Sequence, residues 1–354
     1  MCTIPKNSKL VYGSGGSKTI IAIAPNNNVY KYFPIFLHLM DGTDKAQTLK
    51  NVFKYEIEVL KILTKQFIKK NKTPHLVEFY SDIFCDKIPK SFFDKCLDFK
   101  DYLLTKKKSD KICQYLYQGY PVTHNYGMFV AHVEYCDLQL SIELSKIIKK
   151  SIPTIKNFLD RILFQIIYTL EIIKNDFPLF THRDFFIRNI LAIDVKDNEN
   201  NYVRYNLNGK SYDLPNNGIC IKINDFGMCQ VNKELSKKYL GKNKVVNTPY
   251  NDWFNILYDI YDGGGLGAQS LISLTKNKDK IKFIRKYFSN FMNIKVIDKI
   301  IKSGKRNEIT WNWEMMSDND LVDLLGITNF SDSLDYFYKI FKARPENNIV
   351  KIYE

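Results

Sequence analysis

The chain has 354 residues, of which 45% are hydrophobic and 14% aromatic. This length exceeds what one small core usually supports, so we expect two lobes or domains, and the composition excludes a disordered protein. Basic residues outnumber acidic ones by 52 to 38, which gives a net charge of +14. Only seven of the basic residues are arginine, and the first of them is Arg161. Nucleic-acid binding is therefore possible from the charge but not favoured.

The seven cysteines show neither a CxxC pair nor the spacing of metal ligands. Their odd number, together with the lack of a hydrophobic N-terminal signal, leads us to expect an intracellular, reducing compartment. No apolar run in the sequence approaches the roughly 20 residues that a membrane-spanning helix needs. We therefore expect no membrane span.

The N-terminal part of the chain alternates strand patterns with one helical pattern. Expected strands cover residues 19–24, 29–33, 76–80 and 128–133, and an expected helix covers 46–70. Residues 85–126 between the last two strands are long, polar and aromatic. We interpret this stretch as an insertion.

From residue 138 onward the pattern becomes mainly helical, with a deeply buried helix predicted over 154–174. A hairpin is predicted from 202 to 214, because Asn208-Gly209 at its centre is a strong turn signal. The region around 195–217 is read as a second insertion. A short apolar strand ends at Ile223, and helical segments are expected to dominate after about 250.

Two short motifs carry chemistry. His-Arg-Asp at 182–184 follows the buried helix, with Asn189 five residues after Asp184, and Asp-Phe-Gly at 225–227 follows the short strand. A carboxylate beside a hydroxyl group can orient it and accept its proton, which suits Asp184. Hard divalent cations prefer oxygen ligands, which Asn189 and Asp225 can supply.

In order and spacing these motifs resemble the protein-kinase superfamily, whose HRDxxxxN catalytic loop and DFG motif they match. The resemblance implies an α+β, bilobal, protein-kinase-like fold, with one helix on an antiparallel sheet in the N-lobe and a mainly helical C-lobe. The N-terminal lobe is expected at 1–133, including the insertion 85–126. The hinge is expected at 134–137 and the C-terminal lobe at 138–354.

The same resemblance implies roles for single residues. Asp184 would be the catalytic base, and Asn189 and Asp225 the magnesium ligands. Lys31 occupies the position of the strand lysine that binds the α- and β-phosphates. Glu56 has the spacing of the helix glutamate that pairs with this lysine; the alternative, Glu58, falls about 200° further around the helix.

Further residues are expected around the nucleotide. Residues 13–16 lie where the phosphate-covering glycine loop belongs, although Lys18 replaces its third glycine. Val133 has the gatekeeper position, and the hinge after it would hold the adenine. The complete set of expected nucleotide contacts is Gly13, Ser14, Gly15, Gly16, Ile20, Val29, Lys31, Glu56, Val133, Glu134, Cys136 and Leu191. A P-loop is disfavoured, because Tyr12 and Ser17 stand where its glycines are required.

The sequence also departs from the family pattern. Phe186 stands where serine/threonine kinases usually have lysine, whereas Arg188 matches an arrangement seen in tyrosine kinases. We expect Arg188 to supply the missing positive charge as a third catalytic residue, beside Asp184 and Lys31. Asp252 matches the buried helix aspartate that supports the catalytic loop. No Ala-Pro-Glu motif is present, so regulation by activation-loop phosphorylation is not expected.

We therefore expect an ATP-dependent protein kinase that acts on serine/threonine hydroxyls of an unknown protein substrate, with tyrosine or dual specificity left open. ATP and Mg²⁺ (or Mn²⁺) are the implied cofactors. The divergence and the Lys/Asn/Ile-rich composition resemble kinases of large DNA viruses such as iridoviruses and poxviruses, which would place the protein in host cytoplasm or virion. The alternatives are a pseudokinase scaffold and a kinase-fold enzyme acting on a small molecule.

Overall fold

The computed structural model describes residues 2–12, 20–36, 42–87, 125–198, 200–240, 249–262, 270–302 and 325–354. The chain divides into two compact units. The first consists of Met1–Ile62, Val77–Tyr135 and Lys238–Gly241, and the second of Leu63–Leu76, Cys136–Lys237 and Lys242–Glu354. The fold is α+β with mainly antiparallel sheets, as predicted.

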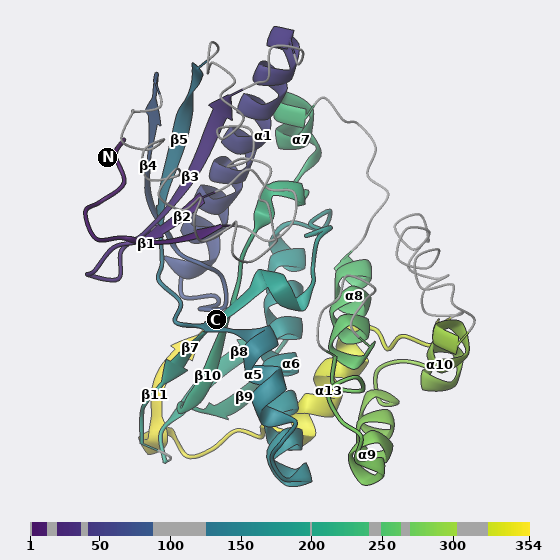
Figure 1. Ribbon diagram of the computed structural model, residues 1–354. Coiled ribbons are helices and arrows are strands. Elements are labelled where there is room, and N and C mark those ends of the chain that lie inside the picture. Colours follow the sequence, from purple (N-terminus) through teal and green to yellow (C-terminus); the bar gives the residue numbers. More distant parts are fainter. Residues whose placement is uncertain are drawn as a thin grey trace. The chain divides into compact units, whose positions relative to one another are not determined.

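The first unit is built on a five-stranded antiparallel sheet with the order β1-β2-β3-β5-β4 (Figure 1). Its strands are β1 (Lys9–Tyr12), β2 (Ile20–Ile23), β3 (Val29–Phe36), β4 (Phe79–Cys85) and β5 (Asn125–Val133). A tight turn joins β2 to β3, with Asn27 at a positive φ of 60°. The predicted strand at 76–80 begins later than expected, because Leu76 forms only an isolated bridge with Ile223.

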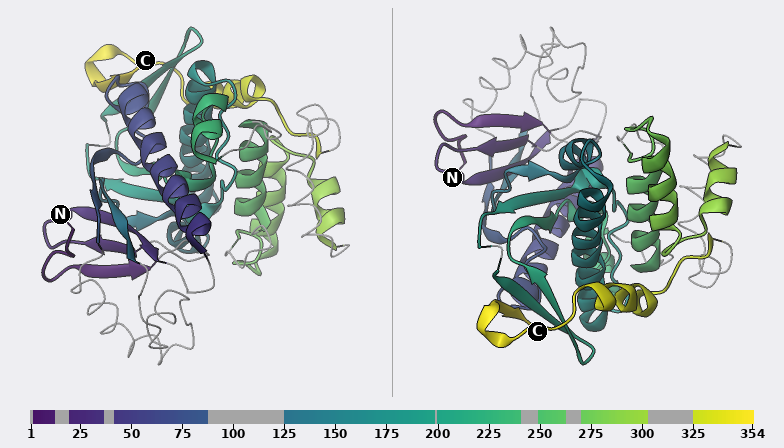
Figure 2. Two further views of the ribbon diagram at one scale, coloured as in Figure 1. Left: turned by 90° about the horizontal axis from the view of Figure 1, so that it is seen from above. Right: turned by 90° about the horizontal axis from the view of Figure 1, so that it is seen from below.

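One long helix, α1 (Gly42–Leu63), covers a face of this sheet (Figure 2). Its C-terminal half is buried on more than one face, because Phe53, Tyr55, Glu56, Ile57, Val59, Leu60 and Leu63 are all buried. Phe53 packs on Phe33 of β3, with ring centroids 5.2 Å apart. The chain continues as a π-helical turn at Thr64–Ile68, so the predicted helical region 46–70 is confirmed except for its last two residues.

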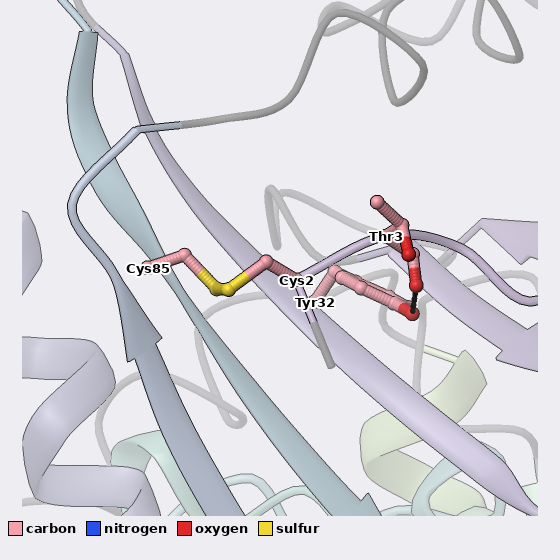
Figure 3. The surroundings of a disulfide bond; sticks show 4 residues. All are labelled: Cys2, Thr3, Tyr32 and Cys85. Carbon is pink, nitrogen blue, oxygen red and sulfur yellow. Dashed lines mark hydrogen bonds between the residues drawn. A yellow bond between two sulfur atoms is a disulfide. The ribbon is translucent and has the colours of Figure 1, made fainter.

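A disulfide joins Cys2 to Cys85 in this unit, 83 positions apart in the sequence (Figure 3). The hydroxyl of Tyr32 donates a hydrogen bond to the carbonyl oxygen of Thr3 (3.1 Å), so the N-terminal segment is attached both to the end of β4 and to β3. The scattered cysteines did not predict this pair, and the expectation of reduced cysteines does not hold for it.

The second unit is mainly helical. Its helices are α5 (Leu140–Ile147), α6 (Ile152–Asp176), α8 (Pro249–Asp262), α9 (Lys278–Phe288), α10 (Ile294–Lys302) and α13 (Phe330–Ile340), and α7 (Lys233–Leu240) begins in it. The predicted buried helix is confirmed as α6, which Ser151 caps by accepting a hydrogen bond from the Thr154 amide. Helices α8, α9 and α13 pack around it.

Two small sheets complete this unit. One has the order β10-β7-β6 and consists of β10 (Gly218–Ile223), β7 (Ile190–Val195) and β6 (Leu138–Gln139). The other has the order β11-β8-β9 and consists of β11 (Ile349–Tyr353), β8 (Tyr202–Leu207) and β9 (Lys210–Pro215).

The second of these sheets includes the predicted hairpin. Its turn is Asn208-Gly209, and both residues have positive φ, as a two-residue hairpin turn requires. The chain does not remain helical to its end, because β11 is a strand that pairs in parallel with β8. No helix among the described residues is long and apolar enough to cross a membrane.

Candidate active site

The segment between α6 and β7 forms a tightly held loop around Asp184. One carboxylate oxygen of Asp184 accepts a hydrogen bond from Nη2 of Arg188 (2.5 Å), and the other accepts one from Nδ2 of Asn189 (2.8 Å). Nδ2 of Asn189 also donates to the Asp184 carbonyl oxygen (2.7 Å). The Asp184 side chain is still 25% exposed, so its carboxylate is accessible to solvent.

Arg188 lies against the residue that replaces the expected lysine. Its guanidinium carbon is 4.6 Å from the ring centroid of Phe186, a cation–π contact. The short helix Ile187–Asn189 fixes the backbone at this point. The guanidinium of Arg188 thus contacts both the Phe186 ring and the carboxylate of Asp184, the predicted base.

Two aspartates of α8 hold the backbone of this loop. Asp252 accepts hydrogen bonds from the amides of His182 (2.5 Å) and Arg183 (3.0 Å), which confirms its predicted supporting role. Asp259, two helical turns later, accepts one from the amide of Ile187 (2.7 Å). The loop is therefore clamped on both sides of Asp184.

Burial of these two carboxyl groups disfavours their charged form. It raises the pKa of Asp252 to about 7 and that of Asp259 to about 6, although the amide donors act in the opposite direction. The sequence analysis did not identify Asp259. The available signal was its spacing of seven residues from Asp252, which places both side chains on one face of a helix.

His182 has a structural role in this loop. Its side chain is fully buried, Nε2 lies 2.9 Å from the carbonyl oxygen of Asn224, and the imidazole packs between the rings of Phe185 and Phe226. Burial lowers the pKa of this histidine, so it is uncharged at neutral pH. It connects the loop around Asp184 with the segment that carries Asp225.

The two predicted metal ligands lie at neighbouring strand ends. Asn189 directly precedes β7 and Asn224 directly follows β10, and the amide of Asn224 donates to the carbonyl oxygen of Asn189 (3.0 Å). Asp225 has a left-handed backbone with φ of 64°. Because Nδ2 of Asn189 donates to Asp184, Oδ1 is the atom of this side chain that could bind a cation. An amide oxygen and a carboxylate suit Mg²⁺ that is otherwise bound by phosphate and water.

In the first unit, Lys31 on β3 forms a buried ion pair with Glu56 on α1. Both side chains are more than nine-tenths buried. Glu58 instead pairs with Lys61 at 3.1 Å on a partly exposed part of the helix. The structure thus brings Lys31 together with Glu56, the preferred partner, and not with Glu58.

The remaining nucleotide residues occupy several elements. Val29 and Val133 are buried neighbours, paired across β3 and β5. The amide of Glu134, the first residue of the predicted hinge, donates a hydrogen bond to the carbonyl oxygen of Glu78 (2.8 Å). The other members are Ile20 in β2, Cys136 before β6 and Leu191 in β7, while Gly13, Ser14, Gly15 and Gly16 lie outside the described residues.

The predicted site residues therefore form two groups, each within one unit. Lys31, Glu56, Val29 and Val133 belong to the first unit. The second unit holds Asp184, Arg188, Asn189, Asp225 and Leu191. That both groups bind a single nucleotide stays a prediction.

Comparison with known proteins gives relatives of one kind. No family model matches the chain. A protein of Acanthamoeba polyphaga mimivirus named "Putative serine/threonine-protein kinase R301" is 32% identical over 370 aligned residues, which cover 95% of this chain and 89% of that protein. A second mimivirus protein, "Putative serine/threonine-protein kinase R400", is 28% identical over 268 residues, covering 72% of this chain and 54% of the relative.

A shorter match comes from another virus. "Probable serine/threonine-protein kinase 380R" of Invertebrate iridescent virus 6 is 34% identical over 80 residues, or 22% of this chain and 15% of the relative. The predicted resemblance to kinases of large DNA viruses is confirmed by these names. Because the first relative is aligned over nearly the whole of both chains, this protein belongs to the viral serine/threonine-protein kinase family of these relatives.

Proposed function

We propose that this protein is an active, bilobal protein kinase that transfers the γ-phosphate of ATP to serine or threonine hydroxyls of a protein substrate. The observation that carries the proposal is the environment of Asp184. Its two carboxylate oxygens accept hydrogen bonds from Arg188 and Asn189, and two aspartates of α8 accept hydrogen bonds from the backbone of the same loop. A rigid, accessible carboxylate is what the positioning of an acceptor hydroxyl requires. The two compact units are then the two lobes.

In this proposal Asp184 orients the acceptor hydroxyl and accepts its proton. The hydroxyl oxygen forms a new bond to the γ-phosphorus, and the bond from that phosphorus to the β–γ bridging oxygen breaks to leave ADP. Lys31, held by Glu56, binds the α- and β-phosphates. Arg188 lies close enough to Asp184 to stabilise the charge of the transferred group.

The metal ion would be held by Asn189 and Asp225. When bound, Mg²⁺ or Mn²⁺ would neutralise charge on the phosphates. The protein would supply an amide oxygen and a carboxylate from two adjacent strand ends. The hydrogen bond from the Asn224 amide to the Asn189 carbonyl oxygen joins the backbones of these two ends. Asn189 also donates to Asp184, so the same side chain would connect the base with a bound metal ion.

The test is transfer of label from γ-labelled ATP to generic protein substrates, with magnesium present, beside an Asp184→Asn variant. We expect transfer to serine and threonine by the unaltered protein, and a loss of about 10²–10⁴-fold in the variant, because general-base assistance is removed. A matched control is Asp194→Asn, which changes a carboxylate on the neighbouring strand β7 outside the site. Transfer that survives Asp184→Asn would disprove the mechanism.

The other outcomes identify the alternatives. If ATP binds but no protein is labelled, a pseudokinase scaffold or a small-molecule kinase is favoured, and the missing Ala-Pro-Glu motif makes the second of these worth assaying. Phosphoamino-acid analysis then separates serine/threonine from tyrosine specificity. This second step matters because Arg188 resembles the tyrosine-kinase arrangement.

A further inference from the structure

A cavity of about 350 Å³ lies within the second unit, apart from the predicted catalytic and metal residues. Its walls come from α6, from β10 and from the small sheet of β8, β9 and β11, which are neighbours in Figure 1. The hairpin β8–β9 is the atypical insertion predicted at 195–217, and β11 is the unexpected C-terminal strand. Small-molecule sites in proteins begin at about 300 Å³. The insertion thus helps to form a cavity large enough for a ligand.

The wall of this cavity has an apolar side and a polar side. Val203, Leu214 and the stacked rings of Tyr205 and Tyr353, 5.3 Å apart, form the apolar side. The polar side includes Arg161, on α6. A ligand that matches both sides needs an apolar body and a polar end.

The polar side carries a positive charge that no carboxylate of the described residues neutralises. The guanidinium of Arg161 donates to the carbonyl oxygens of Pro215 (2.8 Å) and Asn217 and to Oδ1 of Asn217 (3.3 Å). All of these acceptors are uncharged, and among the described residues no carboxylate lies within ion-pair distance of Arg161. Its Nε is buried and has no acceptor within the described part of the chain. Burial lowers the pKa of this guanidinium, which means that its surroundings disfavour the charge.

Arg204 on the same hairpin shows the opposite arrangement. Its guanidinium makes two parallel hydrogen bonds to Asp213, both at 2.9 Å. This carboxylate raises the pKa of Arg204. The two arginines therefore differ in that Arg204 has a carboxylate partner, whereas Arg161 has only uncharged acceptors among the described residues.

The other charges of the wall agree with an anionic partner. Lys351 of β11 is exposed at the cavity. Among the described residues of the lining, Asp197 has the only carboxylate. It accepts hydrogen bonds from the amide of Asn198 and from the side chains of Asn201 and Asn216. His75 is buried beside the cavity, and its pKa is lowered to about 3 mainly by burial, so it adds no charge.

We propose that this cavity binds a small amphipathic anion, with its single carboxylate or phosphate group at Arg161 and its apolar body against the hairpin and β11. The proposal goes beyond kinase activity and does not depend on it. The ligand would stabilise β11 on β8, and it would contact β10, the strand that ends two residues before Asp225.

Cys220 offers a reporter inside the cavity. It lines the wall, it is half-buried, and its sulfur lies 3.6 Å from Nδ1 of His75. Cys136 is also half-buried but is not part of the lining. Alkylation of Cys220 by a neutral reagent should therefore depend on occupancy, whereas alkylation of Cys136 should not.

The experiment measures the rate of iodoacetamide labelling of each cysteine in the full chain, by peptide mass spectrometry. Decanoate and decyl phosphate serve as probes below their aggregation concentrations, and decan-1-ol serves as the uncharged control. We expect at least one anion to slow labelling of Cys220 about tenfold or more, with labelling of Cys136 unchanged and little effect of the alcohol. Protection by only one anion identifies the head group as carboxylate or phosphate.

Three variants test the role of charge. Arg161→Gln should weaken protection by about tenfold to a hundredfold, since a charged hydrogen bond is lost. Lys351→Glu places a negative charge at the exposed rim, and it should also weaken protection even if Arg161→Gln fails to fold. Lys210→Gln removes one positive charge from the same hairpin outside the lining, and it should leave protection unchanged. No protection by either anion, equal protection by the alcohol, or protection undiminished in Lys351→Glu and in any folded Arg161→Gln protein would overturn the proposal.

Discussion

The ion pair between Lys31 and Glu56 is the most buried charge pair of the candidate site. Removing one partner of such a pair leaves the other charge buried and only partly compensated, which is far more costly than the loss of an exposed pair. Glu58 offers a matched comparison on the same helix, because its ion pair with Lys61 is partly exposed. Comparing the substitution of Glu56 with that of Glu58 therefore separates the specific role of Glu56 from the general effect of losing a negative charge.

We expect Glu56→Gln to lower kcat/KM for ATP by about 10–100-fold, which corresponds to the worth of one charged hydrogen bond. Glu58→Gln should change it less than about twofold. Steady-state kinetics with varied ATP measures both variants. If the two variants had equal effects, the assignment of Glu56 as the partner of the phosphate-binding lysine would be wrong.

Asp259 is the second residue whose removal has a predictable consequence. It accepts the amide of Ile187, next to Arg188, while its other oxygen is buried and has no hydrogen-bond partner among the described residues. Asp259→Leu leaves the Ile187 amide without its acceptor and should lower the free energy of unfolding by about 1–3 kcal/mol. Asp259→Asn keeps an oxygen acceptor and should cost less. Chemical denaturation of both variants measures the loss of stability. The kcat of the same variants shows whether that loss also affects catalysis.

The same residue gives the protein a pH dependence of stability. Its pKa is raised to about 6 in the folded state, chiefly by burial, with Arg188 and Asp184 as the charged groups that act on it. A carboxyl group with a raised pKa favours folding most when it is protonated, so its contribution is lost as pH rises from about 4 to about 6. Over this range the unfolding free energy of the unaltered protein should fall by on the order of 3 kcal/mol relative to Asp259→Asn. A constant difference across pH would show that burial does not shift this group.

At the scale of elements, two glycines with positive φ test how strongly local geometry is specified. Gly127 in β5 has φ of 92°, and a Cβ there would lie 2.5 Å from the carbonyl oxygen of Cys85. Gly209 in the hairpin turn has φ of 75°, with nothing within 4 Å of a Cβ. A substituted residue would have an unfavourable positive φ at both positions, but only at Gly127 would its Cβ also clash with neighbouring atoms.

We expect Gly209→Ala to lower the free energy of unfolding by about 1 kcal/mol, the cost of a strained backbone alone. Gly127→Ala should cost more than about 3 kcal/mol, because backbone atoms of β4 must also move. Thermal or urea unfolding of the two variants decides the comparison. Equal losses would mean that strands β4 and β5 can separate at little cost.

The elements that sequence analysis predicted well are those whose signal is local. Helix α6 has apolar residues at helical spacing and a serine cap, and the β8–β9 hairpin has Asn208-Gly209 at its turn. Strand β11 was missed because a short apolar stretch after a helix has no local partner. Its pairing partner, β8, lies far back in the sequence and runs parallel to it.

On the scale of the whole molecule, the candidate site likewise combines features with a local sequence signal and features that depend on distant parts of the chain. The spacing of Asp184 and Asn189 is fixed within one loop, so the sequence alone predicted that they would act together. Asp259 reaches that loop from a different helix, and Arg161 is distinguished from Arg204 only by the carboxylate that it lacks. Such differences depend on tertiary contacts. The seven-residue spacing places Asp252 and Asp259 on one face of a helix, but it does not give the loop that this face contacts.

The disulfide between Cys2 and Cys85 is a long-range tertiary contact within the first unit, and it involves none of the predicted site residues. It closes a loop of 83 residues, and constraining the unfolded chain in this way contributes about 2–4 kcal/mol to stability. Cys85→Ser should therefore lower the free energy of unfolding by that amount, and dithiothreitol should have the same effect on the unaltered protein but none on the variant. Cys136→Ser, which changes a half-buried cysteine outside the disulfide, should leave the unfolding curve in place. An unfolding curve that is indifferent to dithiothreitol would mean that the N-terminal segment is held by contacts such as the Tyr32–Thr3 hydrogen bond alone.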